Sequence, residues 1–341
     1  MKKISIVVPC YNSADTLYRC WNSIKSQSIG IENIECIFVD DCSTDSGKTI
    51  NILNSIKKEE PDSVRVISSD RNRGPGGARN IGISYATGIY LHFTDSDDEL
   101  YDDTIEKLYN IALTYDTDII QYNEILIVND KNRLSKASGE SRFYIIDASE
   151  ERVDFLNSTK VTYGCKNKFY NLDFIRNCRV RFAENLVYEE PLFVYPLFLY
   201  AKRVYLSEEG LYKYHLHPNS IVTSQIGKRI LDHPKVQLLV LEDCMKRSEL
   251  YAKYKDVIAC YFLWSFYCET LMFASEHREA VLPIDYFYYM QEICRKLYPD
   301  WENNSQLMRV DMNAKRILNS LHYEFADQSS LDNFINTLRN N

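Results

Sequence analysis

Several features that define other classes of protein are missing from this sequence of 341 residues. Its ten cysteines include no Cys-x-x-Cys pair and no cysteine–histidine cluster at zinc-finger spacing, so scattered reduced thiols are the simplest interpretation. The apolar run Ile4–Val8 near the N-terminus is too short for the hydrophobic region of a signal peptide. The most apolar later stretch, Tyr261–Phe273, is broken by Ser265 and Glu269 and is shorter than the roughly 20 residues that a membrane span needs. We therefore expect a cytoplasmic protein that is neither exported nor inserted in a bilayer.

An excess of positive charge is also missing. The 40 lysines and arginines are outnumbered by 48 aspartates and glutamates, which gives a net charge of −8. This balance argues against a nucleic-acid partner bound through a broadly basic surface. Hydrophobic residues make up 45% of the chain, so a substantial core is available. At about 150 residues per domain, the length allows one large domain and a smaller one.

The first hundred residues alternate short apolar runs with longer helical patterns. Four runs rich in β-branched or aromatic residues predict buried strands at Ile4–Val8, Cys36–Val39, Val64–Ile67 and Ile89–Phe93. Helices are predicted between them, at Ala14–Gln27, Thr44–Lys58 and Gly77–Ala86. The alternation predicts an α/β fold whose central, mostly parallel sheet carries helices on both faces.

The rest of the chain predicts further strands and helices and then a change of character. Strands are expected at Asp118–Val128, Val161–Tyr170 and Arg203–Tyr214, helices after Tyr101 and at Asn171–Arg176 and Glu189–Tyr200, and a hairpin or mobile loop at Asn129–Arg142. Beyond Gly227 the pattern is helical and rich in aromatic residues. We predict one domain over residues 1–225 and a helical C-terminal region over residues 226–341.

Polar clusters follow three of the predicted strands. They are Pro9-Cys10-Tyr11-Asn12, Asp40-Asp41-Cys42-Ser43 and Thr94-Asp95-Ser96-Asp97-Asp98. The carboxyl ends of parallel strands share one edge of a sheet, where ligands bind, so the acids are expected to converge. Asp95 and Asp97 are two residues apart, and two carboxylates at this spacing can hold one Mg²⁺ or Mn²⁺ ion. The alternative is that the acids only cap the helices that follow.

Two other motifs have both a functional and an ordinary interpretation. The segment Asn72–Asn80 lacks the dinucleotide fingerprint because Arg79 stands where a glycine is needed. A glycine-rich helix start followed by arginine suits a phosphate, but it also suits an ordinary turn with a surface arginine. Glu189 and Glu190 precede an apolar helix, where they either complement the helix dipole or face the crevice and accept a proton from a hydroxyl.

In this order, the motifs resemble those of family 2 inverting glycosyltransferases with the GT-A fold, of the bacterial capsule, exopolysaccharide and lipopolysaccharide type. The five segments are Val7–Asn12, Phe38–Asp45, Gly77–Asn80, Phe93–Asp98 and Tyr188–Glu190. The resemblance implies a Rossmann-like domain with a nucleotide-binding half at 1–100 and an acceptor half at 101–225. It also implies sugar transfer from a nucleotide-diphospho-sugar, with UDP-sugar favoured, to a hydroxyl of a glycan or lipid-linked acceptor, with Mn²⁺ or Mg²⁺ as cofactor.

The resemblance also implies roles for individual residues. Asp97 would be the direct metal ligand, with Asp95 beside it, and His217 is a further candidate ligand. Glu190 stands at the position of the catalytic base, with Glu189 as its neighbour. The nucleotide-sugar site would comprise Pro9, Tyr11, Asn12, Asp40, Asp41, Arg79, Asp95 and Ser96.

Two departures from the family pattern bear on these roles. Glu190 replaces the commoner aspartate and lengthens the base by one methylene, and Cys42 replaces a frequent glycine. A non-catalytic nucleotide-sugar or glycan-binding protein of the same fold therefore stays an alternative. A glycoside hydrolase would also use paired carboxylates, but it has no need of a nucleotide crevice.

Three further expectations concern residues outside the five segments. Trp21 is expected in the core, Lys168 is a candidate for the acceptor site, and His215 is a candidate for the metal or diphosphate.

The stripe Tyr261, Trp264, Tyr267, Cys268 and Leu271 fits one helical face. Core packing is its default role, and the alternatives are a homodimer face or peripheral association with the inner face of the cell membrane. Lastly, the acids gathered at one crevice would repel a diphosphate, which argues for a metal cofactor.

Overall fold

The computed structural model describes residues 2–128, 131–134, 140–158, 160–216, 227, 229–277, 279–307 and 312–339. The chain divides into two compact units, one of Met1–Asp147 with Val161–His217 and one of Ala148–Lys160 with Pro218–Asn341. The segment Ala148–Lys160 thus belongs to the second unit, although strands of the first unit follow it in the sequence. The predicted boundary at residue 225 lies outside the described residues and stays a prediction.

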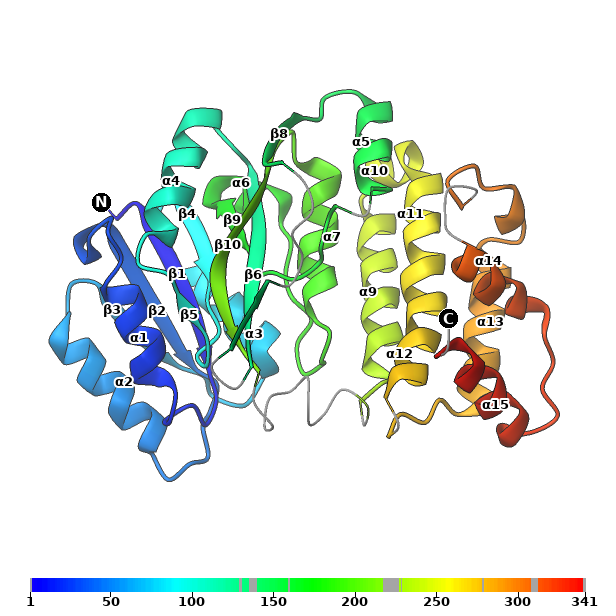
Figure 1. Ribbon diagram of the computed structural model, residues 1–341, viewed down its shortest axis with the longest axis horizontal. Coiled ribbons are helices and arrows are strands. Elements are labelled where there is room, and N and C mark those ends of the chain that lie inside the picture. The colour runs from blue at the N-terminus through cyan, green and yellow to red at the C-terminus, as the bar shows by residue number, and fades with distance from the viewer. Residues whose placement is uncertain are drawn as a thin grey trace. The chain divides into compact units, whose positions relative to one another are not determined.

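The first unit is built on a ten-stranded sheet (Figure 1). The strand order is β3-β2-β1-β4-β9-β6-β10-β5, with β7 paired to β6 and β8 to β10. The strands β3, β2, β1 and β4 run parallel, as do β6 and β10, whereas β9 is antiparallel to both of its neighbours. The strands are β1 (Ile4–Cys10), β2 (Ile34–Asp40), β3 (Val64–Ser68), β4 (Tyr90–Phe93), β5 (Glu99–Leu100), β6 (Ile119–Val128), β7 (Lys131–Leu134), β8 (Arg142–Ile145), β9 (Lys168–Asn171) and β10 (Arg203–His215).

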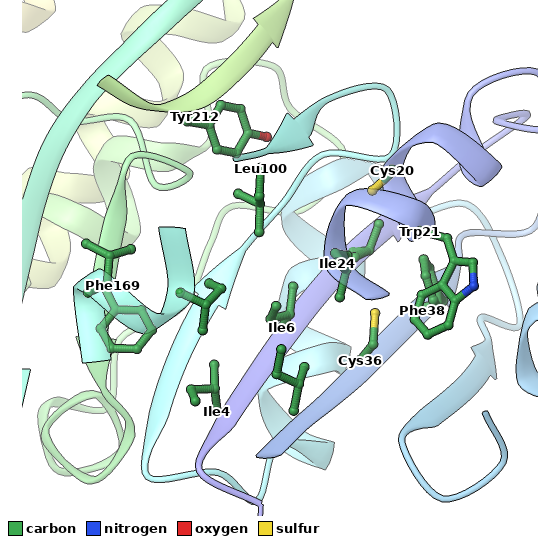
Figure 2. Packing of buried hydrophobic residues seen from close by; sticks show 14 of the residues in the cluster. Ile4, Ile6, Cys20, Trp21, Ile24, Cys36, Phe38, Leu100, Phe169 and Tyr212 are labelled. Carbon is green, nitrogen blue, oxygen red and sulfur yellow. The ribbon is translucent and has the colours of Figure 1, made fainter. Parts of the chain in front are cut away.

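Helices cover both faces of this sheet, as the alternation predicted. They are α1 (Leu17–Lys25), α2 (Lys48–Glu59), α3 (Gly74–Tyr85), α4 (Thr104–Tyr115), α6 (Leu172–Cys178) and α7 (Glu190–Tyr200), with a short 3-10 turn at Ile31–Asn33. Because side chains alternate along β1, Ile4, Ile6 and Val8 share one cluster with residues of α1, α2 and α4. Figure 2 shows part of this cluster, with Ile4 and Ile6 of β1 and Trp21 and Ile24 of α1. Trp21 lies in that cluster and is fully buried, which confirms its predicted role.

The opposite face of the sheet receives α3 and α7. A Cβ atom added at Gly82 would lie 2.3 Å from Cγ1 of Val7, so glycine lets α3 approach β1 closely. Phe93, at the end of β4, lies edge-on to Phe182 and Phe193, and these two rings stack with centroids 4.2 Å apart. This aromatic cluster holds the chain before α7 close to the end of β4. The two acids at the start of α7 are thereby brought toward the acids that follow β4.

Some predicted boundaries differ from the structure. The predicted strand Val161–Tyr170 is wrong over its first seven residues, because β9 begins at Lys168 and the preceding loop bonds to side chains instead of a ladder. The hairpin alternative for Asn129–Arg142 is confirmed over β7, which pairs antiparallel with β6. Helix α2 begins at Lys48 rather than Thr44, and Asp45 Oδ2 accepts the amide of Thr49 in its first turn at 2.9 Å.

The second unit is helical, as predicted for the C-terminal region. Its elements are α5 (Ser149–Leu156), α9 (Asp232–Lys246), α10 (Ser248–Lys253), α11 (Lys255–Phe262), a π-helical stretch η2 (Leu263–Glu269), α12 (Thr270–Glu276), α13 (Ile284–Leu297), α14 (Met312–Asn319) and α15 (Gln328–Leu338), with 3-10 turns at Trp301–Asn303 and Ser320–His322. Of the aromatic stripe, Tyr261, Tyr267, Cys268 and Leu271 are buried and Trp264 is half-buried, which confirms core packing as its main role.

The helical run Lys255–Glu276 has 22 residues and is long and apolar enough to cross a membrane by length and composition. The expectation that this region is too short was therefore wrong, since the helix extends on both sides of Tyr261–Phe273. Within its most apolar window, 78% of the residues are buried in the protein, a share also typical of core helices. None of the ten cysteines forms a disulfide, as predicted.

Candidate active site

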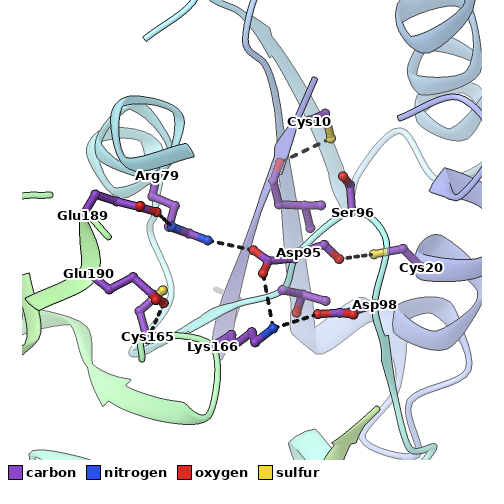
Figure 3. A network of polar contacts seen from close by, with 12 residues as sticks. Cys10, Cys20, Arg79, Asp95, Ser96, Asp98, Cys165, Lys166, Glu189 and Glu190 are labelled. Carbon is purple, nitrogen blue, oxygen red and sulfur yellow. Dashed lines mark hydrogen bonds and ion pairs between the residues drawn. The ribbon is translucent and has the colours of Figure 1, made fainter. Parts of the chain in front are cut away.

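Asp95, just after β4, is held by two cationic side chains from different parts of the chain. Arg79 Nη2 lies 2.8 Å from Asp95 Oδ1, and Lys166 Nζ lies 3.7 Å from Oδ2 (Figure 3). Burial alone would raise the pKa of Asp95, but the two cations more than offset it and lower that pKa. Asp95 therefore stays ionised at the strand end, at the expected place in the predicted crevice.

The same arginine connects the strand end to the start of α7. Arg79 lies on α3, is 4% exposed, and donates its other terminal nitrogen, Nη1, to Oε1 of Glu189. Burial raises the pKa of Glu189 to about 7, and Arg79 opposes that rise. The chain Asp95–Arg79–Glu189 brings together three residues that the sequence analysis assigned to one site.

Glu190, the predicted base, is the first residue of α7. Its Oε1 accepts the backbone amide of Cys165 at 2.7 Å (Figure 3). Glu189 and Glu190 thus have different partners, one an arginine from α3 and the other a backbone amide from the loop before β9. Glu189, the N-cap residue of α7, makes no side-chain capping hydrogen bond.

Asp98 has a structural role that the sequence analysis missed. It is fully buried and accepts hydrogen bonds from the Tyr212 hydroxyl and the His215 amide, each at 2.8 Å. Lys166 Nζ lies 3.2 Å from it. Burial raises the pKa of Asp98 to about 7 despite the neighbouring lysine. Tyr212 also accepts the amide of Asp95 at 3.0 Å, so β10 and the end of β4 are joined by side chains as well as by the sheet.

Lys166 and Tyr212 were both missed by the sequence analysis. Lys166 lies in a loop that was predicted to be a strand, and Tyr212 is one of 26 tyrosines in the chain. The Lys166 ammonium lies 3.4 Å from the centroid of the Tyr214 ring. The signal in the sequence was the polar and aromatic run of residues 212–217, of which only the histidines His215 and His217 were considered as site residues.

The two aspartates after β2 are buried and serve the local backbone. Asp41 accepts the amide of Arg73 on both carboxylate oxygens, at 2.9 and 3.0 Å, and so fixes the chain just before α3. Burial raises the pKa of Asp41, and the hydrogen bond from Arg73 opposes that rise. Asp40 Oδ1 accepts the amide of Ser43 at 3.3 Å. Cys42 has a φ of 60°, in the left-handed region, which explains why glycine suits this position.

The polar residues after β1 connect to the same two neighbouring loops. Asn12 Oδ1 accepts the amide of Thr44 at 2.7 Å, and the Tyr11 side chain is 47% exposed. Ser96 exchanges a hydrogen bond of 2.8 Å with Ser13. Pro9 is buried in β1. Apart from Arg79, which lies on α3, the residues predicted to hold the nucleotide therefore come from the ends of the adjacent strands β2, β1 and β4.

The glycine-rich segment has a packing role. A Cβ atom added at Gly76 would lie 2.1 Å from the carbonyl oxygen of Ala183, and the Arg73 carbonyl accepts the amide of Asn185 at 2.7 Å. These contacts seat the start of α3 against the chain that leads to Glu189. The alternative of an ordinary turn with a surface arginine is wrong, because Arg79 is buried.

The predicted metal ligands are only partly described. His217 lies outside the described residues, and His215 directs its ring to Glu99, with Nε2 at 2.7 Å from Oε1. Among the described residues, no three His, Cys, Asp or Glu side chains are placed to hold a metal ion. Asp97 is half-buried, and its backbone carbonyl accepts a hydrogen bond from Arg19. Asp97 would offer such an ion one carboxylate, an oxygen ligand of the kind that Mg²⁺ and Mn²⁺ prefer.

Lys168 does not line an open site, contrary to expectation. Its side chain is fully buried, and its ammonium bonds to oxygens of the preceding loop.

Comparison with known proteins identifies the class to which this arrangement belongs. The family model described as "Glycosyl transferase family 2" matches residues 5–178, from the second residue of β1 to the end of α6. The chain belongs to this family of glycosyltransferases.

Two curated relatives are similar to this chain over most of its length. The chain is 30% identical over 253 residues to the succinoglycan biosynthesis protein ExoO of Rhizobium meliloti, covering 72% of this chain and 69% of that protein. It is also 30% identical over 213 residues to a poly(ribitol-phosphate) beta-glucosyltransferase of Bacillus spizizenii. The match spans 62% of this chain but only 32% of the Bacillus enzyme.

A solved structure shares the fold. The structure of S. aureus TarS 1-349 in complex with UDP superposes with a TM-score of 0.71 and 20% sequence identity, over 99% of this chain and 90% of that chain. The likeness confirms the predicted GT-A fold with its C-terminal helices.

Proposed function

We propose that this protein is an inverting glycosyltransferase that moves a sugar from a UDP-sugar to a hydroxyl group of a surface-polysaccharide acceptor. The observation that carries the proposal is the chain Asp95–Arg79–Glu189, which brings the acids after β4 to the start of α7, where Glu190 stands. The solved complexes of S. aureus TarS 1-349 with UDP and with UDP-GlcNAc support a UDP-sugar donor. The names of the Bacillus and Rhizobium relatives support a polysaccharide or teichoic acid pathway. A cytoplasmic location and a glycan or lipid-linked acceptor stay predictions.

In the proposed mechanism, Glu190 accepts the proton of the acceptor hydroxyl as that oxygen attacks the anomeric carbon. The bond from this carbon to the diphosphate breaks on the opposite face, so a single displacement inverts the configuration. The Cys165 amide orients Glu190, and Arg79 fixes Asp95 and Glu189 around the site. Asp97, with Asp95 beside it, would hold Mn²⁺ or Mg²⁺, which when bound offsets the negative charge on the leaving diphosphate.

The donor site is tested by thermal unfolding of the full chain with UDP, with Mn²⁺, and with both together. We expect the melting temperature to rise most when both are present, and Asp97→Asn to remove the contribution of the metal. If no nucleoside diphosphate, with or without metal, changes the melting temperature, the donor assignment is wrong.

The catalytic base is tested by Glu190→Gln, which keeps an oxygen to accept the Cys165 amide. We expect UDP binding to be retained and transfer to be lost. Glu184→Gln is the matched control, since Glu184 pairs with Arg73 and has a side chain that is 39% exposed. If Glu190→Gln transfers sugar at the wild-type rate, Glu190 is not the base. If wild type hydrolyses and transfers no nucleotide sugar from a broad panel but still binds UDP, a non-catalytic binding protein is the better description.

A further inference from the structure

The loop of residues 162–167 contacts both groups of acids in the site. The Cys165 amide donates to Glu190, and the next residue, Lys166, lies 3.2 Å from Asp98 and 3.7 Å from Asp95 (Figure 3). A shift of this loop therefore moves both contacts at once. The position of the loop is thus a determinant of the geometry around Glu190.

Lys168, the first residue of β9, holds this loop from the inside. Its ammonium donates to the Gly164 carbonyl at 2.5 Å, to Thr162 Oγ1 at 3.1 Å and to Asn167 Oδ1 at 3.0 Å. An ammonium has three donors, and here each has an oxygen of the loop or its end as partner. Gly164 itself lies close to the base, since a Cβ atom added there would be 4.0 Å from Glu190 Oε1.

Other side chains anchor the two ends of the loop and the Cys165 carbonyl. Gln121 Oε1 accepts the Thr162 amide at 3.0 Å, and Tyr122 donates its hydroxyl to the Lys166 carbonyl at 2.8 Å. Tyr170 donates to the Cys165 carbonyl at 3.3 Å. Of these contacts, only those of Lys168 reach the Gly164 carbonyl, in the middle of the loop next to the base.

The burial of Lys168 needs an explanation beyond packing. The side chain has no exposed surface, and burial lowers the pKa of Lys168 to about 8, an effect that nearby Glu190 opposes. Burying an ammonium is costly, whereas a neutral side chain of similar length would fill the same volume at less cost. Its three loop contacts supply that explanation, because each of them fixes part of the chain that carries the Cys165 amide.

We propose that Lys168 is a positioning residue for Glu190, which it serves by holding the 162–167 loop in place. With the loop fixed, the Cys165 amide keeps the Glu190 carboxylate oriented toward the acceptor hydroxyl. The inference rests on the proposed function for the role of Glu190, but the state of the loop can be measured without turnover.

The main test is Lys168→Met, which keeps the length of the side chain and removes the ammonium. We expect kcat to fall about 100-fold, as for a displacement of a catalytic group by about 1 Å, while the donor KM changes less than about threefold. Hydrogen exchange of backbone amides should speed up in a peptide spanning 162–167 and stay unchanged in a peptide spanning β1. An unchanged loop exchange, or a kcat within about threefold of wild type, overturns the proposal.

A milder variant keeps the test decisive if Lys168→Met does not fold. Thr162→Val, at an exposed position, removes one acceptor of the ammonium together with the hydrogen bonds of the same hydroxyl to Gln121 and Asn167. We expect the same changes with a kcat loss of at least about fivefold. Thr104→Val is the matched control, because its buried hydroxyl donates to the Leu211 carbonyl outside the loop. Equal effects of the two Thr→Val changes on kcat and loop exchange contradict the positioning role.

The two proposals fail in different ways. If the wild-type protein shows no transfer, the proposed function fails, whereas hydrogen exchange still reports whether Lys168 holds the loop. If transfer depends on Glu190 but Lys168→Met leaves the loop protected, only the positioning role fails.

Discussion

The buried pair of Arg79 and Glu189 gives the sharpest prediction about stability. Both side chains are at least nine-tenths buried, with side-chain exposures of 5% and 8%. Removing one partner of a buried ion pair typically costs about 3–5 kcal/mol, because the other charge is left uncompensated. We therefore expect Arg79→Met to lower the free energy of unfolding by about 3 kcal/mol or more at pH 8.

The dependence on pH follows from the pKa of Glu189, which is raised from 4.5 to about 7 by burial. Because the folded protein holds this proton more tightly than the unfolded chain, Glu189 destabilises the fold progressively as pH rises from about 4.5 to 7. The shift corresponds to about 3 kcal/mol. Without Arg79 the pKa of Glu189 rises further, so the loss continues above pH 7. At pH 5.5 Glu189 is mostly protonated in the variant, and the cost of Arg79→Met should be smaller there.

The assay is urea unfolding of wild type, Arg79→Met, Glu189→Gln and the double variant at pH 5.5 and pH 8. We expect the double variant to recover about 2 kcal/mol relative to Arg79→Met at pH 8, since of the two carboxylates that Arg79 pairs with only Asp95, which Lys166 also neighbours, then keeps its charge. A cost of Arg79→Met below about 1 kcal/mol, or a cost equal at both pH values, would refute this electrostatic reasoning.

Three further predictions concern stability and can be checked by the same unfolding assay. Gly76→Ala should lower the free energy of unfolding by about 2–3 kcal/mol, because its Cβ atom would lie 2.1 Å from a carbonyl oxygen. Gly164→Ala, whose Cβ atom would have no neighbour nearer than 3.6 Å, should change it by less than about 0.5 kcal/mol. Equal effects of the two variants would contradict the packing argument. Cys42→Gly should stabilise by about 0.5–1 kcal/mol because the residue adopts a left-handed φ of 60°, and a loss of stability shows that the Cys42 side chain makes a compensating contact. Burial lowers the pKa of His92 from 6.5 to about 3, so the stability that its neutral form provides is complete above pH 6.5 and is lost as the pH falls toward 3, by about 2 kcal/mol at pH 5. His92→Gln should remove that part of the pH dependence of the free energy of unfolding. Identical pH profiles of wild type and variant would contradict this contribution of His92.

The elements around the parallel strands could be predicted because local sequence determines them. A strand buried on both faces, such as β1, reads as a short continuous apolar run, and polar residues mark where it ends. Asp95, Arg79, Glu189 and Glu190 were identified as site residues because they fall in motifs next to such boundaries. Their mutual contacts were only an expectation until the sheet order was known.

The residues that were missed depend on pairings between distant parts of the chain. Tyr212 meets Asp95 and Asp98 only because β10 pairs antiparallel with β5, across more than a hundred residues of sequence. Lys166 lies in a loop whose backbone groups form hydrogen bonds with side chains, and hydrophobic periodicity does not reveal such bonds. Helix α5 (Ser149–Leu156) belongs to the second unit, although strands of the first unit follow it, and no local feature of its sequence indicates that assignment.

The charges of the site refine the argument for a metal ion that the sequence suggested. The acid excess alone does not require a cation, because Arg79 and Lys166 already compensate part of the charge of Asp95, Asp98 and Glu189. An incoming diphosphate nevertheless adds negative charge beside carboxylates whose cations are already engaged, so its binding should be favoured by any further cation at Asp97. The two ligands are then coupled, and the coupling is reciprocal: the factor by which Mn²⁺ tightens UDP must equal the factor by which UDP tightens Mn²⁺. Titration calorimetry in both orders measures the two factors. If UDP binds equally well with and without Mn²⁺, Arg79 and Lys166 suffice for the diphosphate, and the proposed metal site at Asp97 has no role in donor binding.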